Sequence, residues 1–83
     1  MRKEVIQSLE REKKISQLAI SHLRDQLRNY EKKFNLTTVE FLDKFNSGSI
    51  GDDEIYFKWY SLAQALIDWQ NTKEALEEEI VSK

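Results

Sequence analysis

The chain has 83 residues with 13 Lys and Arg against 15 Asp and Glu, which allows one domain and only a modest hydrophobic core if it folds alone. It contains no Cys and a single His, which excludes a disulfide framework and a Cys/His zinc site. Association with another chain is the remaining way to stabilise so small a domain.

Charge is distributed unevenly along the chain. Residues 1–33 hold nine Lys and Arg and five Asp and Glu, a net of +4, whereas residues 34–83 hold four and ten, a net of −6. The two halves therefore attract each other if the chain folds back on itself, and the acidic half can also face a basic partner. No apolar run approaches the roughly 18 residues of a membrane span, and no signal peptide is recognised, so we expect a cytoplasmic protein.

The first element predicted is a long helix over about residues 2–34. Proline is absent, and an apolar stripe recurs with helical spacing. The stripe consists of Val5, Ile6, Leu9, Ile20, Leu23, Leu27, Tyr30 and Phe34. Lys13 and Ser16 occupy the same stripe in the first half of the helix, so we expect its packing there to be weaker.

A short connector helix is predicted over about residues 38–46. Thr37 is a good N-cap, and Glu40 stands where its carboxylate completes a capping box. Asn46, Ser47 and Gly48 tolerate the left-handed backbone at which helices end.

The last element predicted is a long helix over about residues 53–81, with Asp52, Asp53 and Glu54 favourable at its start. Its apolar residues span an arc of roughly 200°, about twice what one neighbouring helix covers. The predicted fold class is therefore all-α: one domain over residues 1–83, an antiparallel helical hairpin of two long helices with a short connector, assembling into a dimeric bundle.

Eight of the nine aromatic residues lie between Tyr30 and Tyr60, around the connector. We expect them to close that end of the hairpin as a small core, with a partner pocket as the alternative. Phe57 points away from the main apolar arc, and Trp69 lies far from the connector, where tryptophan often anchors an interface. The candidate partner-binding residues are Phe57, Trp59, Leu62, Leu66, Trp69, Asp52 and Asp53.

Two smaller features leave alternatives open. Ile15 and Leu18 fall outside the main stripe and form either a second contact patch or scattered exposed residues. Basic residues also recur at four-residue spacing in the first helix: Arg24, Arg28 and Lys32. The first helix would contact nucleic acid through these residues, although the net negative charge of the chain argues against nucleic-acid binding.

No catalytic chemistry is indicated. His22 has Asp25 three residues on, which favours an ion pair on the helix surface over a metal site. No Ser, Thr or Lys pairs with a convincing general base. The acidic run before the last helix lacks the Gly-rich phosphate cradle and Lys that would make it a magnesium site. We therefore expect a non-enzymatic protein without metal or cofactor.

Residues 31–69 carry two motifs, K-F-N-L-T-T-V-E-F and F-N-S-G-S-I-G-D-D, followed by an aromatic-rich helix. About half the chain thus resembles small helical antitoxins of prokaryotic toxin–antitoxin pairs. The resemblance implies a partner toxin, often a ribonuclease or a nucleotidyltransferase, that is inhibited by direct binding. The alternatives are a self-associating structural or adaptor coiled coil and a nucleic-acid-binding helix pair.

Overall fold

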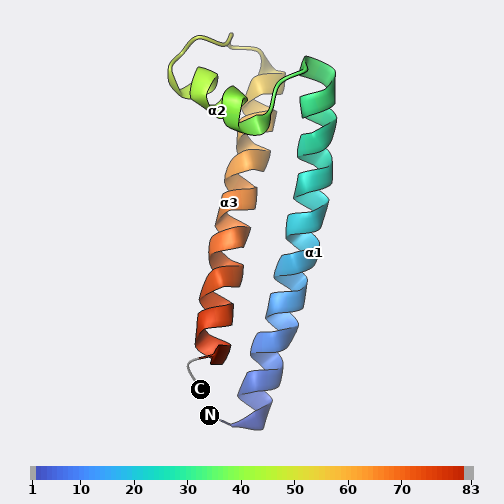
Figure 1. The fold of residues 1–83 in the computed structure, drawn as a ribbon, viewed down its shortest axis with the longest axis vertical. Helices are drawn as coiled ribbons and strands as arrows, with labels where there is room; N and C mark the ends of the chain where they lie inside the picture. Colours follow the sequence, from blue (N-terminus) through green and yellow to red (C-terminus); the bar gives the residue numbers. More distant parts are fainter. Residues whose placement is uncertain (1, 82–83) are drawn as a thin grey trace.

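The computed structural model describes residues 2–81 and contains three α-helices in this part of the chain. They are α1 (Lys3–Phe34), α2 (Thr38–Asn46) and α3 (Glu54–Val81). Helices α1 and α3 lie side by side and antiparallel, and α2 sits across the end at which they are joined (Figure 1). The start of α1 and the end of α3 lie together at the opposite end. The predicted all-helical hairpin is thus confirmed, and its long axis extends 51 Å.

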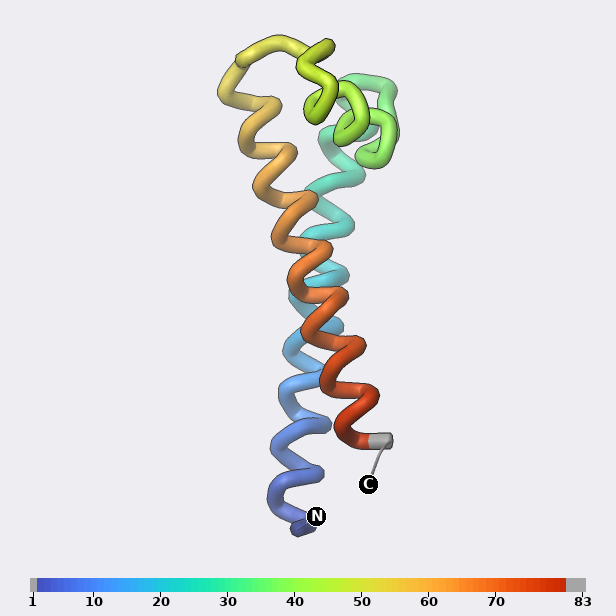
Figure 2. Tube along the Cα trace, turned by 90° about the vertical axis from the view of Figure 1, so that its left-hand side faces the viewer, coloured from blue at the N-terminus to red at the C-terminus, as the bar shows by residue number. Residues whose placement is uncertain are grey.

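Both long helices follow the predicted boundaries to within one residue. Helix α1 ends because Asn35 adopts a left-handed backbone (φ 51°) while its N–H donates to the carbonyl oxygen of Glu31. Seen from the side, α3 crosses α1 at a shallow angle (Figure 2).

No helix among the described residues is long and apolar enough to span a membrane.

Helix α2 is fixed at its start by two sets of hydrogen bonds. The predicted capping box is present: the Glu40 N–H donates to Thr37 Oγ1 at 3.1 Å, and the Thr37 N–H donates to Glu40 Oε1 at 3.2 Å. The Thr38 N–H donates to Glu31 Oε2 of α1 at 2.7 Å. This second bond ties the connector to the end of α1.

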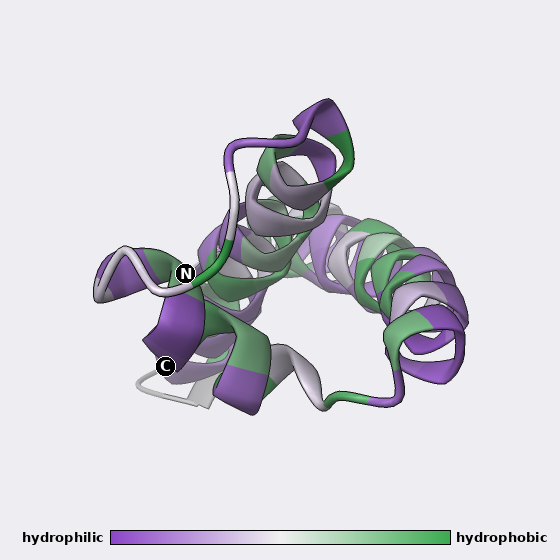
Figure 3. Ribbon diagram, turned by 90° about the horizontal axis from the view of Figure 1, so that it is seen from above, coloured by the Kyte–Doolittle hydropathy of each residue, from purple (hydrophilic) through white to green (hydrophobic). Residues whose placement is uncertain are grey.

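The connector end holds the hydrophobic core. Its buried members are Leu27, Phe41, Trp59 and Ala63, and partly buried apolar residues of all three helices pack around them. Trp59 stacks on Phe41 with ring centroids 4.0 Å apart and planes inclined by 4°. Viewed from above, hydrophobic residues are seen on each of the three helices (Figure 3). The aromatic core predicted for this end is confirmed.

Trp59 corrects one prediction, since it was expected to contact a partner. Its side chain is 0% exposed, and its indole Nε1–H donates to Thr38 Oγ1 at 3.2 Å. Tyr30 and Phe34 also stack against it, with centroids 5.6 Å and 5.5 Å away. Trp59 is buried because α2 covers the part of the α3 arc on which it lies.

The other half of the hairpin is packed more thinly. Among the side chains that the structure describes, α3 has no buried residue after Ala63, whereas α1 buries Ser16, Ile20 and Leu23 in addition to Leu27. Ser16 is 1% exposed, and its hydroxyl donates to the Glu12 carbonyl oxygen of its own helix. Core packing therefore weakens with distance from the connector.

Candidate protein interface

One side of the hairpin is free of Lys, Arg, Asp and Glu over about four turns of each long helix. The residues recur at spacings of three and four, which places those of each helix in one arc. We call this surface the uncharged face; it comprises Ile15, Leu18, Ala19, His22, Gln26 and Asn29 of α1 and Ser61, Leu62, Ala65, Trp69, Thr72 and Leu76 of α3.

A surface hollow links the two helices on this side. Gln26 and Tyr30 of α1 line it together with Ser61 and Leu62 of α3, so both arcs belong to the same side of the hairpin. Glu54, Phe57 and Lys58 also line this hollow, so charged residues border the uncharged face at the connector end. A second hollow next to it on α3 is lined by Ala65, Asp68, Trp69 and Thr72. The uncharged face is therefore continuous across both helices, with Asp68 at its edge.

Apolar side chains on the uncharged face are unusually open to solvent. Leu18 is 72% exposed and Ile15 is 51% exposed. Three apolar residues of α3 on this face are half-buried: Leu62, Trp69 and Leu76. Helix α2 does not cover them, because it packs at the connector end. Large apolar groups left in water on one face are typical of an interaction surface.

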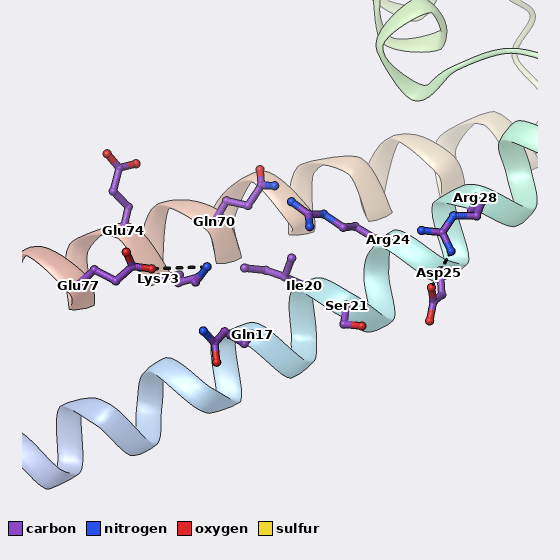
Figure 4. A pocket seen from close by; sticks show the side chains of 10 residues that line it. All are labelled: Gln17, Ile20, Ser21, Arg24, Asp25, Arg28, Gln70, Lys73, Glu74 and Glu77. Carbon is purple, nitrogen blue, oxygen red and sulfur yellow. Dashed lines mark hydrogen bonds and ion pairs between the residues drawn. The ribbon is translucent and has the colours of Figure 1, made fainter.

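The opposite side carries the charges. A hollow of about 500 Å³ between α1 and α3 is lined by ten residues, six of them charged (Figure 4): Gln17, Ile20, Ser21, Arg24, Asp25, Arg28, Gln70, Lys73, Glu74 and Glu77. Two ion pairs lie in its walls: Arg28 Nη1 to Asp25 Oδ1 at 3.2 Å in α1, and Lys73 Nζ to Glu77 Oε1 at 3.5 Å in α3. Each pair lies within one helix and on the surface, so it adds little stability.

The candidate nucleic-acid residues fall on this charged side or beside it. Arg24 and Arg28 share the hollow with Glu74 and Glu77, whose carboxylates repel phosphate. Lys32 is exposed and lines a separate hollow near the start of α2. Arg24 and Arg28 thus lie beside acidic residues of α3, although the two ion pairs of this hollow each stay within one helix.

A third surface is an apolar groove at the connector end. Leu27 and Ala63 belong to its lining, along with Leu42 and Leu66. Two of its apolar lining side chains are open to solvent: Val39, 78% exposed, and Ile67, 40% exposed. Val39 was not among the candidate residues, although its position on the side of α2 opposite Phe41 was a usable signal. Ile67 lies in the wide apolar arc of α3. Helical periodicity alone does not tell which residues of that arc are exposed and which are buried.

The loop before α3 forms an acidic tip beside this end. Asp52 and Asp53 are exposed, and Glu54, the first residue of α3, is paired with Lys58 at 3.7 Å. Phe57 is 50% exposed and meets the ring of Phe45 edge-on at 5.5 Å. Phe57 is therefore covered on one side by the connector and open on the other.

The candidate partner-binding residues do not form one patch. Leu62 and Trp69 lie on the uncharged face, and Leu66 lines the apolar groove. Asp52, Asp53 and Phe57 lie at the connector end, and Trp59 is in the core. The uncharged face along the helices and the acidic, aromatic surface at the connector meet at one hollow, which Leu62 and Phe57 both line, and the apolar groove lies elsewhere.

Within residues 2–81, no group of three or more His, Cys, Asp or Glu side chains is arranged to hold a metal ion. Comparison of the chain with protein-family models, with curated proteins and with solved structures gives no match. Its function is therefore argued from the surfaces just described.

Proposed function

We propose that this chain is a non-enzymatic protein-binding module. The observation that carries the proposal is the exposure of large apolar side chains on a chain in which 34% of residues are charged. Leu18, Val39 and Phe57 are each at least half exposed, and they lie on the uncharged face, in the apolar groove and at the connector tip respectively. Burial of such groups against another protein removes apolar area from water, which favours association.

The specific form that we propose is an antitoxin that neutralises a toxin by direct binding in the cytoplasm. The segment that resembles antitoxins, residues 31–69, includes the connector, the acidic tip and the start of α3. Asp52 and Asp53 at the tip give the connector end a charge that suits a basic, nucleic-acid-handling site on a toxin. Phe57, in the first turn of α3, supplies apolar contact area near them.

The test begins with co-expression of this chain with the toxic product of a neighbouring open reading frame. Rescue of growth and a measurable complex of the two purified proteins are expected. Growth arrest that persists despite normal levels of this chain would contradict the antitoxin proposal.

The acidic tip is tested by reversing its charge with Asp52→Lys and Asp53→Lys together. We expect toxin affinity to fall by about tenfold or more and to become less sensitive to salt, because two attractive charges become repulsive. Glu10→Lys with Glu78→Lys, at exposed positions far from the connector, is the matched control and should change affinity little. Unchanged affinity and salt dependence in the tip variant would show that the toxin binds elsewhere.

We also propose that two copies of the hairpin associate, as the width of the α3 apolar arc predicts. The thin packing beyond Ala63 supports this, since Trp69, Leu76 and Ile80 remain only half-buried. A small domain with incomplete burial gains stability from a second layer of helices. Self-association without any other partner is the second candidate function.

A further inference from the structure

We infer that the uncharged face is the surface on which a second copy of this chain packs, so that two hairpins form a four-helix bundle. This inference rests on the proposed self-association and assigns it to named residues. It leaves the acidic tip and the apolar groove at the connector free for a different partner.

The first argument is electrostatic. In an interface between identical copies related by a two-fold axis, the same patch faces itself, so a charged side chain near the axis meets its own like charge. Twelve positions of the uncharged face hold no Lys, Arg, Asp or Glu, although 34% of the chain is charged. The acidic tip, which carries Asp52 and Asp53, would by contrast repel a copy of itself.

The second argument is the kind of side chain present. Ile15, Leu18, Leu62, Trp69 and Leu76 are apolar and of the type that anchors interfaces when buried. The polar members carry groups that both donate and accept hydrogen bonds, so they can pair with their own copies; they are His22, Gln26, Asn29, Ser61 and Thr72. Ala19 and Ala65 are small enough for helices to approach closely.

The third argument is area. At 1.5 Å per residue the face is about 23 Å long, and two adjacent helices are about 20 Å wide. Two such faces in contact bury about 900 Å² in total, which is above most crystal-packing contacts and in the range of weak, reversible interfaces. The same contact would cover the half of the hairpin where α3 has no buried residue after Ala63 among the described side chains.

The experiment compares the oligomeric state of the full chain with that of two variants by sedimentation over a wide range of concentration. Ile15→Glu with Leu18→Glu places like charges on the face at positions that are more than half exposed, so the hairpin itself should still fold. Val39→Glu, at an equally exposed apolar residue in the connector groove, is the matched control. We expect a dimer for the wild type and for Val39→Glu, and a dimer weakened by about tenfold or more for the double variant.

A second measurement does not depend on the stability of the double variant. The chain has no Cys, so Leu18→Cys and Val39→Cys each introduce one defined thiol at an exposed site. Oxidation should cross-link two copies through position 18 far more efficiently than through position 39. Cross-linking at position 39 alone would overturn the assignment.

The outcomes separate this inference from the proposals on which it rests. A wild-type dimer that is unaffected by the double variant means that the copies associate through another surface. A wild-type monomer at every concentration overturns both the self-association and this face. Neither result bears on the rescue of growth in the toxin co-expression test, which can succeed or fail independently.

Discussion

Trp59 is the residue on which the described core depends most. Its indole is fully buried, stacks on the rings of α1 and α2, and donates a hydrogen bond to Thr38. One side chain of α3 thereby holds both the connector and the end of α1. A buried aromatic group with a satisfied N–H contributes packing and a specific orientation together.

Replacing Trp59 by Ala should destabilise the fold severely. Loss of such a ring leaves a cavity and costs about 3 to 5 kcal/mol, a large part of the roughly 5 to 15 kcal/mol that stabilises a small protein. Urea unfolding followed by far-UV circular dichroism measures the change. Trp59→Phe is the control, since it keeps a stacked ring and loses the hydrogen bond, and it should cost less; an alanine variant as stable as the wild type would contradict the described core.

The aromatic core was predictable from the sequence, but Trp59 fitted both that core and a partner contact, and its burial decides for the core. Helical periodicity ranks Trp59, Leu62 and Trp69 alike as members of one wide arc. Which part of the arc is covered depends on where α2 packs against α3, and that contact joins residues far apart in the sequence. The same reason explains why the hydrogen bond between Thr38 and Glu31 of α1 was not predictable, whereas the local capping box was.

Among the elements, α2 is the one whose position is set by its N-terminal hydrogen bonds. Thr37 donates from its hydroxyl at 2.9 Å and from its backbone N–H to the carboxylate of Glu40. These two bonds hold the pKa of the Glu40 carboxyl below its ordinary value of 4.5, and the bond from the Thr37 hydroxyl has the larger effect. The capping box thus favours an ionised Glu40.

The stability of the hairpin should therefore depend on pH through Glu40. Because the folded-state pKa is lowered, the contribution is fully present above about pH 4.5 and disappears as pH falls through the lower folded value. Melting temperatures of the wild type and Glu40→Gln, measured from neutral to acidic pH, should differ most above this range and converge below it. A constant difference across the whole series would mean that ionisation of Glu40 does not stabilise α2.

At the scale of the whole molecule, stability is concentrated at one end. The buried cluster joins residue 27 of α1, α2 and the first third of α3, while the far half is held by fewer buried side chains. Contact with a second copy along the uncharged face would reinforce that weaker half. The two long helices are thus unequal within the hairpin: α1 buries side chains as far from the connector as Ser16, whereas α3 buries none after Ala63 among the described side chains, and both expose apolar residues on the uncharged face.

Hydrogen exchange should reveal this gradient. Backbone amides of residues 20–34 and 56–66 should exchange most slowly, because opening them disrupts the core, and those of residues 5–14 and 70–80 should exchange faster. Measuring the Ile15→Glu and Leu18→Glu double variant as well removes any protection that comes from a second copy. Uniform protection along both helices in that variant would contradict a core confined to the connector end.

The placement of the helix ends has a practical consequence for handling the protein. Helix α1 starts and α3 finishes at the same end, at the far end of the long axis from α2 and the acidic tip (Figure 1). A fluorescent reporter or an immobilisation tag attached beyond either helix is therefore held away from the connector. Such fusions leave the tip presented outward, so a sensor surface carrying this hairpin by one terminus displays its acidic end to any partner in solution.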